Sequence, residues 1–289
     1  MKNKDSIINH KSSIINHSVV FFGSSKYVIP ILEELKDKLC LIVTTEKETT
    51  EPVIDYSIKN NIPYLSVSIF DNSLKSYILS LKAEIAVLAD FGLKLPSDII
   101  TAFPKGIVNI HPSLLPEYRG PTPVQTAILN RNKVSGVTLM LLDDKIDHGP
   151  IIDQQKESIL ETDTADSLYA NFFKIGADLL TKNLEKYING EIKLKEQDDS
   201  KATYSKTLNR QCGYFDLKNP PKKKVLERMI KAFYPWPGAW TVTRYEGKDL
   251  RVKFLPNNKI QVEGKKPTGY KDFQNGYPIL YNEFSKILK

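Results

Sequence analysis

Apolar runs alternate with amphipathic stretches over the first two thirds of the chain. Continuous apolar runs predict buried strands, and stretches with apolar residues every three or four positions predict helices. The predicted strands cover 18–23, 40–44, 83–89, 106–111 and 136–142, with a further short element at 62–65. The predicted helices cover 28–38, 54–60, 74–82, 124–130 and 164–188. This alternation is typical of βαβ units and predicts an α/β domain with a Rossmann-like, mostly parallel sheet.

The pattern changes after residue 206. Two prolines precede an amphipathic helix at 222–233, whose apolar face carries Val225, Met229, Ile230 and Phe233. Short runs then predict strands at 241–245, 250–255 and 260–263. A small basic β unit of this kind suits an OB-like β-barrel, and with three clear strands in place of five we expect a shortened one. The predicted organisation is a flexible leader at 1–17, a catalytic domain at 18–188, a linker at 189–206 and a basic OB-like domain at 207–289.

Composition removes several classes of protein. An apolar content of 41% with 26% charged residues is that of a globular chain. No apolar run reaches the length of about 18 residues that a membrane span needs. The polar N-terminus lacks a secretory signal, so we expect a cytoplasmic protein. Cys40 and Cys212 are far apart in the sequence, which predicts neither a disulfide framework nor a zinc motif.

The net charge of +7 is unevenly distributed. Residues 1–204 hold 23 Lys and Arg against 27 Asp and Glu, a net of −4, whereas residues 205–289 hold 18 against 7, a net of +11. A basic domain attached to a mildly acidic one favours a polyanionic partner such as RNA, although a solubilising surface is the alternative.

Two polar residues interrupt the predicted strand at 106–111. In an extended strand residues i and i+2 share a face, so Asn109 and His111 point the same way. The carboxyl ends of strands in an open α/β sheet border the ligand crevice. An amide and an imidazole presented there can bind a developing oxyanion and move a proton. The alternative is that both side chains only satisfy nearby backbone groups.

A carboxylate partner for the imidazole is expected on the turn after the next strand. If the strands at 106–111 and 136–142 were parallel neighbours, the stretch LLDDKIDHGPII would lie beside His111. Asp147 could then orient the ring and favour its protonated form. Spacing alone leaves Asp143, Asp144 and His148 as rivals. A metal site of His111, His148 and Asp147 is unlike common zinc motifs, so no metal is expected.

These residues carry a family resemblance. NIHPSLLPEYRGPTPVQTAI, followed by GVTLMLLDDKIDHGPII, resembles the signature of the folate-dependent formyltransferases. That family combines an Asn-x-His pair, an SLLP-x-x-RG loop and an aspartate in a D-x-G turn. The resemblance implies that Asp147, and not Asp143 or Asp144, is the catalytic carboxylate beside Asn109 and His111.

The resemblance also implies the co-substrate and further site residues. The formyl donor would be 10-formyltetrahydrofolate, with no metal. The folate-binding residues would be Leu88, Ala89, Phe91, Gly92, Leu93, Leu142 and Asp144. Phe91 and Leu93 could equally be core residues. The substrate-binding residues would be Ser113, Leu114, Leu115, Pro116, Arg119 and Gly120, with Arg119 near the mouth of the site.

The C-terminal half resembles the branch of the family that formylates initiator methionyl-tRNA. RQCGYFDL, MIKAFYPWPGAWT and the EGKKP…DFQNG ending carry this resemblance, which implies a tRNA partner; we expect a monomer. The loop at 44–52 departs from that branch, because it is short and holds one Lys against three Glu. Two alternatives stay open: a formyltransferase acting on an amino sugar nucleotide, and a non-catalytic RNA-binding protein.

Overall fold

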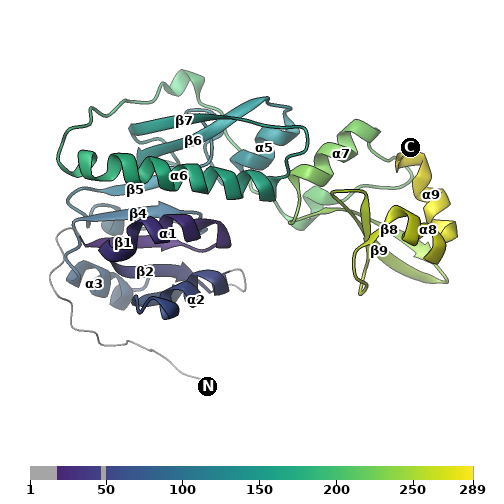
Figure 1. The fold of residues 1–289 in the computed structure, drawn as a ribbon, viewed down its shortest axis with the longest axis horizontal. Coiled ribbons are helices and arrows are strands. Elements are labelled where there is room, and N and C mark those ends of the chain that lie inside the picture. The colour runs from purple at the N-terminus through teal and green to yellow at the C-terminus, as the bar shows by residue number, and fades with distance from the viewer. Residues whose placement is uncertain (1–17, 47–49, 289) are drawn as a thin grey trace. The chain divides into compact units, whose positions relative to one another are not determined.

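The computed structural model describes residues 18–46 and 50–288, so the predicted leader and part of the 44–52 loop lie outside the described residues. A seven-stranded sheet organises the N-terminal part (Figure 1), in the order β3-β2-β1-β4-β5-β6-β7. Its strands are β1 (Val19–Gly23), β2 (Leu39–Thr45), β3 (Tyr64–Val67), β4 (Ile85–Ala89), β5 (Ile107–His111), β6 (Val134–Leu141) and β7 (Ile151–Ser158). The pairs β2–β3, β1–β2, β1–β4 and β4–β5 are parallel, which confirms the Rossmann-like prediction.

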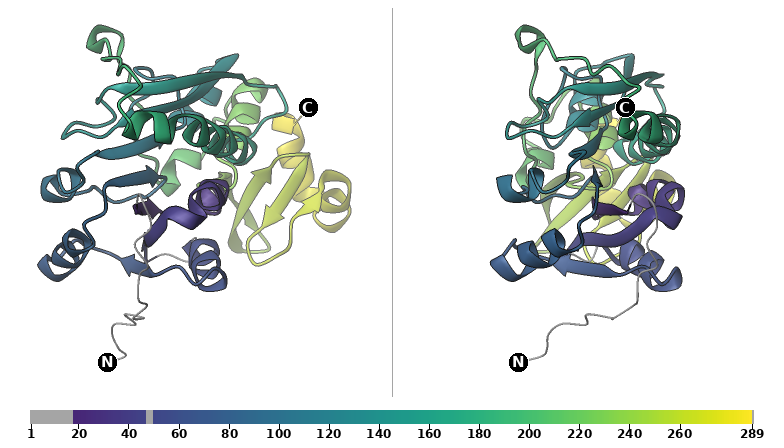
Figure 2. Two further views of the ribbon diagram at one scale, coloured as in Figure 1. Left: turned by 60° about the vertical axis from the view of Figure 1, so that its left-hand side comes forward. Right: turned by 90° about the vertical axis from the view of Figure 1, so that its left-hand side faces the viewer.

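Helices cover both faces of this sheet. They are α1 (Ile29–Leu35), α2 (Glu51–Lys59), α3 (Asn72–Ser80), α4 (Ser97–Ile100) and α6 (Ala165–Ile188). A further helix, α5 (Pro123–Leu129), lies between β5 and β6 in the sequence. Figure 2 shows α1 on one face and α3 on the other. On the α3 face, alternate residues of β1 and β4, among them Phe22 and Ala86, join α3 and α4 in one buried apolar cluster. The five helices predicted in this part are confirmed, with ends displaced by a few residues.

Two strands differ from the prediction. Strand β6 runs antiparallel to β5, with Leu141 opposite Val108 and Thr138 opposite His111. The expected parallel arrangement of these two strands is therefore wrong. Strand β7 is not predicted either, because IIDQQKES has only two apolar residues at its start and reads as a polar segment.

The chain divides into two compact units. The second combines 120–135 and 158–169 with 205–289, which differs from the single continuous range expected from sequence. The reason is that α5 packs against α7 (Lys223–Ala232). This unit holds an antiparallel sheet of β8 (Ala239–Tyr245), β9 (Lys248–Leu255), β10 (Lys259–Val262) and β11 (Thr268–Gly269).

Two helices complete the second unit. Helices α8 (Tyr270–Gly276) and α9 (Pro278–Leu288) place Phe273 and Phe284 against Phe254 of β9 in its apolar core. Sequence reasoning predicts neither helix, and the polar residues and glycines at 262–278 obscure the pattern of α8. Within the described residues, no helix has the length and apolar character needed to cross a membrane.

Candidate active site

The side chains of strand β5 alternate between the two faces of the sheet. A Cβ on Gly176 of α6 would come within 2.5 Å of Ile110 Cγ2, so Ile110 faces α6 at very close range. Asn109 and His111 therefore emerge on the opposite face, and each is 5% exposed. The strand thus carries an amide and an imidazole to one side of the sheet, as predicted.

Asp147 completes a three-residue cluster. The Asn109 Nδ2 donates a hydrogen bond to Asp147 Oδ1 over 3.2 Å, and His111 Nδ1 lies 3.6 Å from Asp147 Oδ2. One carboxylate therefore faces both side chains. The route to this arrangement is not the expected one. Because β6 ends beside the start of β5, the chain after Leu141 must fold back to bring Asp147 to the middle of β5.

The histidine ring has a defined tautomer when it is neutral. Its Nε2 lies 3.0 Å from the carbonyl oxygen of Tyr118. A carbonyl oxygen only accepts hydrogen bonds, so this contact places a proton on Nε2. In the neutral ring the lone pair is then on Nδ1, directed toward Asp147. His111 is therefore set to accept a proton at Nδ1, close to a carboxylate that stabilises the resulting imidazolium.

The turn that carries Asp147 is held by a glutamine. Asp147 has a φ of +46°, in the left-handed region, and this conformation costs about 1–2 kcal/mol for a residue with a side chain. Gln197 Nε2 donates hydrogen bonds to the carbonyl oxygens of Asp147 and Gly149, at 2.9 and 2.8 Å. Two such bonds contribute about 1–3 kcal/mol together, which is enough to offset the strain. Gly149 is also required, because a Cβ there would lie 2.0 Å from the Leu141 carbonyl oxygen.

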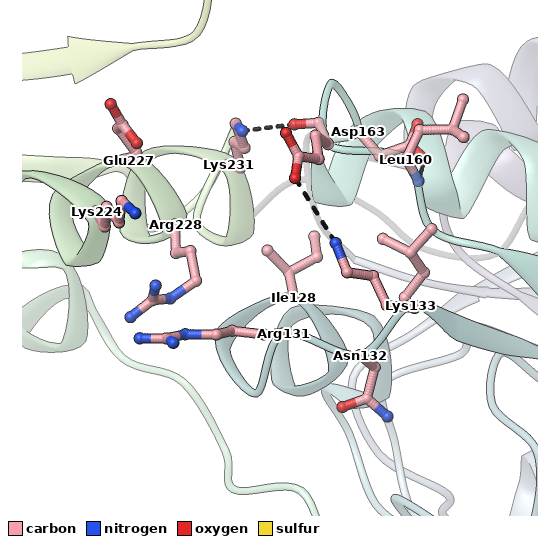
Figure 3. Close-up of a pocket in the computed structure, with 12 residues that line it drawn as sticks. Ile128, Arg131, Asn132, Lys133, Leu160, Asp163, Lys224, Glu227, Arg228 and Lys231 are labelled. Atoms are coloured by element: carbon pink, nitrogen blue, oxygen red, sulfur yellow. Dashed lines mark hydrogen bonds and ion pairs between the residues drawn. The ribbon is translucent and has the colours of Figure 1, made fainter.

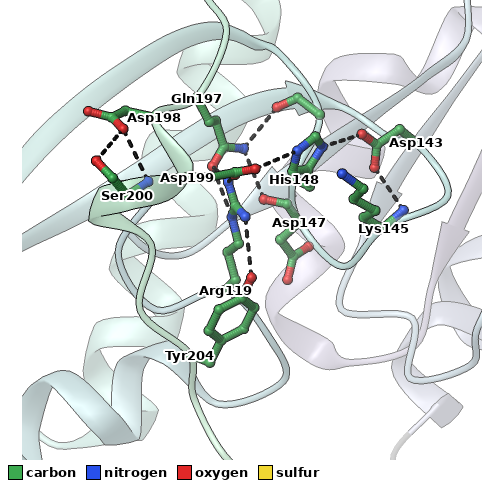
Figure 4. Close-up of polar contacts among 11 residues, drawn as sticks. Arg119, Asp143, Lys145, Asp147, His148, Gln197, Asp198, Asp199, Ser200 and Tyr204 are labelled. Carbon is green, nitrogen blue, oxygen red and sulfur yellow. Dashed lines mark hydrogen bonds and ion pairs between the residues drawn. The ribbon is translucent and has the colours of Figure 1, made fainter.

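Arg119 anchors Gln197 from the other side (Figure 4). Its Nε and Nη2 donate to Gln197 Oε1 at 3.1 and 2.9 Å, and Nη2 also donates to Asp199 Oδ1 at 2.8 Å. Burial alone would lower the pKa of the guanidinium, but the hydrogen bonds with Asp199 and Tyr204 raise it overall. The side chain is 2% exposed. Arg119 is therefore a buried cation with partners inside the protein, and its expected contact with substrate near the mouth of the site stays a prediction.

Two of the rivals, Asp143 and His148, form a second cluster with Asp199. His148 Nδ1 lies 2.6 Å from Asp143 Oδ2, and His148 Nε2 lies 3.2 Å from Asp199 Oδ2. Asp143 thus pairs with His148, while Asp144 is exposed. Figure 4 shows the Asp147 side chain extending away from Gln197 and from this second cluster. The geometry brings Asp147 to His111 and leaves its rivals elsewhere. Among the described residues, no group of three or more His, Cys, Asp or Glu could hold a metal ion.

The predicted substrate-binding loop is largely built into the protein. Ser113 is fully buried and donates to the Glu117 carbonyl oxygen at 2.6 Å, and Leu115 packs with Met140 and Ile151. Leu114, Pro116 and Gly120 are partly exposed. Substrate contact by this loop stays a prediction, and the side chains open to it are those of Leu114 and Pro116.

One predicted folate residue, Leu88, lies on the same face of the sheet as Asn109. The register of β4 and β5 places Leu88 opposite Asn109, so the two side chains emerge side by side. Leu88, Leu93 and Leu142 are partly exposed and pack on the apolar cluster beneath them. Ala89 and Phe91 are instead buried, and Phe91 packs edge-on against Phe22 with ring centroids 5.5 Å apart. Gly92 and Asp144 are exposed.

Gln197 and Asp199 are functional neighbours that sequence reasoning misses. Both lie in the polar stretch 189–206, which reads as a linker. Neither periodicity nor composition distinguishes them, because their partners are far away in the chain. A motif search with aligned relatives is the signal that could have found them.

The comparisons with known proteins identify the family of this chain. Residues 26–184 match the family model described as formyl transferase. A methionyl-tRNA formyltransferase from Chloroflexus aurantiacus is 38% identical over 246 residues, which cover 81% of this chain and 78% of the relative. The corresponding protein from Buchnera aphidicola subsp. Schizaphis graminum is 34% identical over 233 residues, with 76% and 73% covered.

Solved structures share the fold. An N-formyltransferase from Helicobacter canadensis, in a complex with folinic acid and dTDP-3-aminofucose, superposes with a TM-score of 0.60. Its sequence is 21% identical, and the match covers 85% of this chain and 94% of the other. This likeness extends over both compact units.

Proposed function

The chain belongs to the formyl transferase family, on the branch of the methionyl-tRNA formyltransferases, and we propose that it transfers a formyl group from 10-formyltetrahydrofolate to the amino group of methionine on initiator tRNA. The observation that carries this proposal is that one largely buried carboxylate, that of Asp147, faces both Asn109 and His111. The same proposal places the protein in the cytoplasm with the charged tRNA.

In this proposal His111 transfers the proton of the attacking amine. A methionine amine must lose a proton as it bonds to the formyl carbon. The lone pair on His111 Nδ1 can take that proton, since Tyr118 occupies Nε2. The gap of 3.6 Å to Asp147 leaves Nδ1 without a short hydrogen bond to the carboxylate. Asp147 then stabilises the charged ring, and the ring can return the proton to the departing nitrogen.

In this proposal Asn109 stabilises the negative charge that develops on the formyl oxygen. Its Nδ2 carries two hydrogens, and one is donated to Asp147 Oδ1. The second can be donated to the oxygen. Because the amide is fixed by Asp147, it needs no reorganisation as charge develops. A donor fixed in this way is worth on the order of 100-fold to 1,000-fold in rate.

The residues on this face fit the folate. When bound, 10-formyltetrahydrofolate supplies the formyl carbon on a nitrogen that can leave. Leu88, Leu93 and Leu142 offer partly exposed apolar surface for a flat ring system beside Asn109. Asp90 and Gly92 both have positive φ, at +46° and +80°, so the loop between β4 and α4 turns sharply there. These residues would hold the folate next to the cluster.

The basic second unit supports the tRNA partner. A cavity of about 350 Å³ lies at the end of α5, beside the loop at 159–163 and α7 (Figure 3). Its lining has five basic and three acidic residues: Arg131, Lys133, Lys224, Arg228, Lys231, Glu161, Asp163 and Glu227. An RNA phosphate would meet an excess of positive charge at this cavity.

Two arginines of this cavity, Arg131 and Arg228, have no partner to neutralise them among the described residues. Figure 3 shows the guanidinium groups of Arg131 and Arg228 side by side. Within the described residues, neither side chain has a hydrogen bond or an ion pair, whereas Lys133 pairs with Glu161 at 3.6 Å. Adjacent like charges repel, and a phosphate accepting from both guanidiniums relieves that repulsion. We propose that this pair contacts the tRNA backbone in place of a basic loop at 44–52.

The acceptor is tested by direct competition. Wild-type protein receives 10-formyltetrahydrofolate together with methionyl-tRNA and an amino sugar nucleotide, and both products are quantified by mass spectrometry. We expect formylmethionyl-tRNA, with the sugar left unmodified. Formylation of the sugar alone would overturn the proposal. Salt-sensitive tRNA binding with no product would instead favour a non-catalytic RNA-binding protein.

The arginine pair has its own test. Arg228→Glu should raise the KM for methionyl-tRNA about tenfold at constant kcat and reduce the slope of log K against log salt by about 1. Arg244→Glu, on β8 of the same unit and outside the cavity, is the matched control. Equal effects of both variants would mean that only overall charge matters and that the cavity is not a contact site.

A further inference from the structure

The segment 195–204 contacts both loops that hold the partners of His111. At one end, Lys195 and Ile151 exchange backbone hydrogen bonds of 2.8 and 2.9 Å. Gln197 then binds the carbonyl oxygens of Asp147 and Gly149. At the other end, Thr203 binds the loop that carries Tyr118. We call residues 195–204 the strap.

The contacts at the Thr203 end are as extensive as those at the Gln197 end. The backbone nitrogen of Arg119 donates to the Thr203 carbonyl oxygen at 2.9 Å, and that of Thr203 donates to the Pro116 carbonyl oxygen at 3.2 Å. The backbone nitrogen of Tyr118 donates to Thr203 Oγ1 at 2.9 Å. Tyr118, with a φ of +57°, is thus held in an unusual conformation with its carbonyl oxygen on His111.

The two ends are joined through Arg119. Its guanidinium binds Gln197 Oε1 twice and Asp199 once, while its backbone pairs with Thr203 and Tyr204. The Gln197 amide therefore makes four hydrogen bonds. Its oxygen accepts two from Arg119, and its nitrogen donates two to the turn that carries Asp147. No other described contact of the amide is needed to fix its orientation.

We propose that the strap is a positioning device for the reaction and that Gln197 is its key positioning residue. Gln197 sets the Asp147 turn, and Thr203 sets the Tyr118 carbonyl, so the strap fixes the two groups between which the His111 ring lies. This inference rests on the proposed function, because it assigns the strap a role in the same transfer reaction. Gln197 acts through Asp147 and does not itself touch the reacting atoms.

The kinetic test is a double-mutant cycle. Gln197→Met keeps the length of the side chain and removes all four hydrogen bonds. A displacement of about 1 Å at a catalytic group can cost on the order of 100-fold, so we expect kcat to fall by about 10-fold to 100-fold. The KM values for tRNA and folate should stay within about threefold. In an Asp147→Asn background, Gln197→Met should have almost no further effect on kcat.

The matched control is Gln261→Met. Gln261 Nε2 donates to the Lys265 carbonyl oxygen at 3.0 Å, so it also ties down a turn, but far along the chain in the second unit. We expect wild-type kcat for this variant. If the losses from Gln197→Met and Asp147→Asn multiply, Gln197 does not act through Asp147 and the proposal is overturned.

A measurement independent of activity separates this proposal from the proposed function. Hydrogen exchange followed by mass spectrometry should show faster exchange over 143–150 in Gln197→Met, with the rest of the unit unchanged. Unchanged exchange in this turn overturns the strap, whatever the acceptor. Faster exchange in Gln197→Met, found together with a wild-type protein that formylates no tRNA, would overturn the proposed function and keep the strap as the support of the Asp147 turn.

Discussion

Two aspartate–histidine pairs meet at one turn and differ in almost every physical respect. In the first, His111 is 5% exposed and its Nδ1 lies 3.6 Å from Asp147. In the second, His148 lies 2.6 Å from Asp143 and also contacts Asp199, with its side chain 24% exposed. The second pair has the shorter contact and the more complete set of partners. In the first pair, the 3.6 Å between His111 Nδ1 and Asp147 Oδ2 is too long for a short hydrogen bond.

This difference separates the chemistry that is open to the two pairs. A histidine held between two carboxylates has both ring nitrogens occupied, so it can stabilise a turn but cannot accept a proton from a substrate. His111 has one nitrogen fixed by a carbonyl and one left open toward a carboxylate and an amide. Short contacts alone would point to His148, whereas the proposed function assigns the proton transfer to His111.

The largest effect should separate the two histidines. His111→Ala removes the proton acceptor and should lower kcat for methionyl-tRNA by on the order of 100-fold or more. His148→Ala removes only support for the turn, so we expect a loss below about tenfold, the range of an indirect effect. Steady-state rates of both variants at saturating substrates provide the measurement. Equal losses would mean that the pairs do not divide the work in this way.

Substitution of Asp147 should likewise lower kcat more than substitution of Asp143. Asp147→Asn keeps the size of the side chain but removes the charge that faces His111, and should lower kcat on the order of 100-fold. Asp143→Asn should stay within about threefold of wild type. A larger loss from Asp143→Asn than from Asp147→Asn would reverse the assignment of the catalytic carboxylate.

Acid should remove the contribution of the Asp199 charge to stability. The hydrogen bond from Arg119, and then the charge of His148, hold the pKa of the Asp199 carboxyl below its ordinary value. A depressed folded-state pKa stabilises the protein above the unfolded value of about 3.9, and this contribution is lost as the pH falls through the folded value.

Thermal unfolding tests this sign. The melting temperature of wild type should exceed that of Asp199→Asn near pH 6, and the gap should close as the pH falls below about 4. Because the carboxylate is exposed, the gap should be small. A gap that widens in acid would show that the Asp199 charge does not stabilise the folded state.

The smallest effect concerns the second pair itself. Exposed pairs contribute about 0.2–1 kcal/mol, so a double-mutant cycle on Asp143 and His148 should give a coupling free energy of that size. Chemical denaturation of the two single variants and the double variant measures it. A coupling well above this range would make the pair a major element of stability.

Sequence predicts the parts of the site that depend on local periodicity. Alternation along β5 predicts that Asn109 and His111 share a face, and the structure confirms it. Spacing could not choose Asp147 over Asp143, because the choice depends on how the chain folds back after Leu141. The predicted parallel pairing of β5 with β6 is wrong, but the chain after Leu141 still brings Asp147 to His111.

Long-range polar contacts account for what sequence could not supply. Arg119 is charged and so reads as a surface residue, but Gln197, Asp199 and Tyr204 satisfy it in the interior. Gln197 lies in a polar stretch that resembles a linker. In each case the decisive partner is about 50 or more residues away, beyond any local pattern.

The most direct test of the account asks whether Asn109 and His111 act as one unit around Asp147. Single-turnover rates of formyl transfer to methionyl-tRNA would be measured for Asn109→Ala, His111→Ala and the double variant. Groups that act together are strongly non-additive, so the double variant should be about as slow as the slower single variant. Losses that multiply, or a single variant that keeps the wild-type rate, would contradict the account.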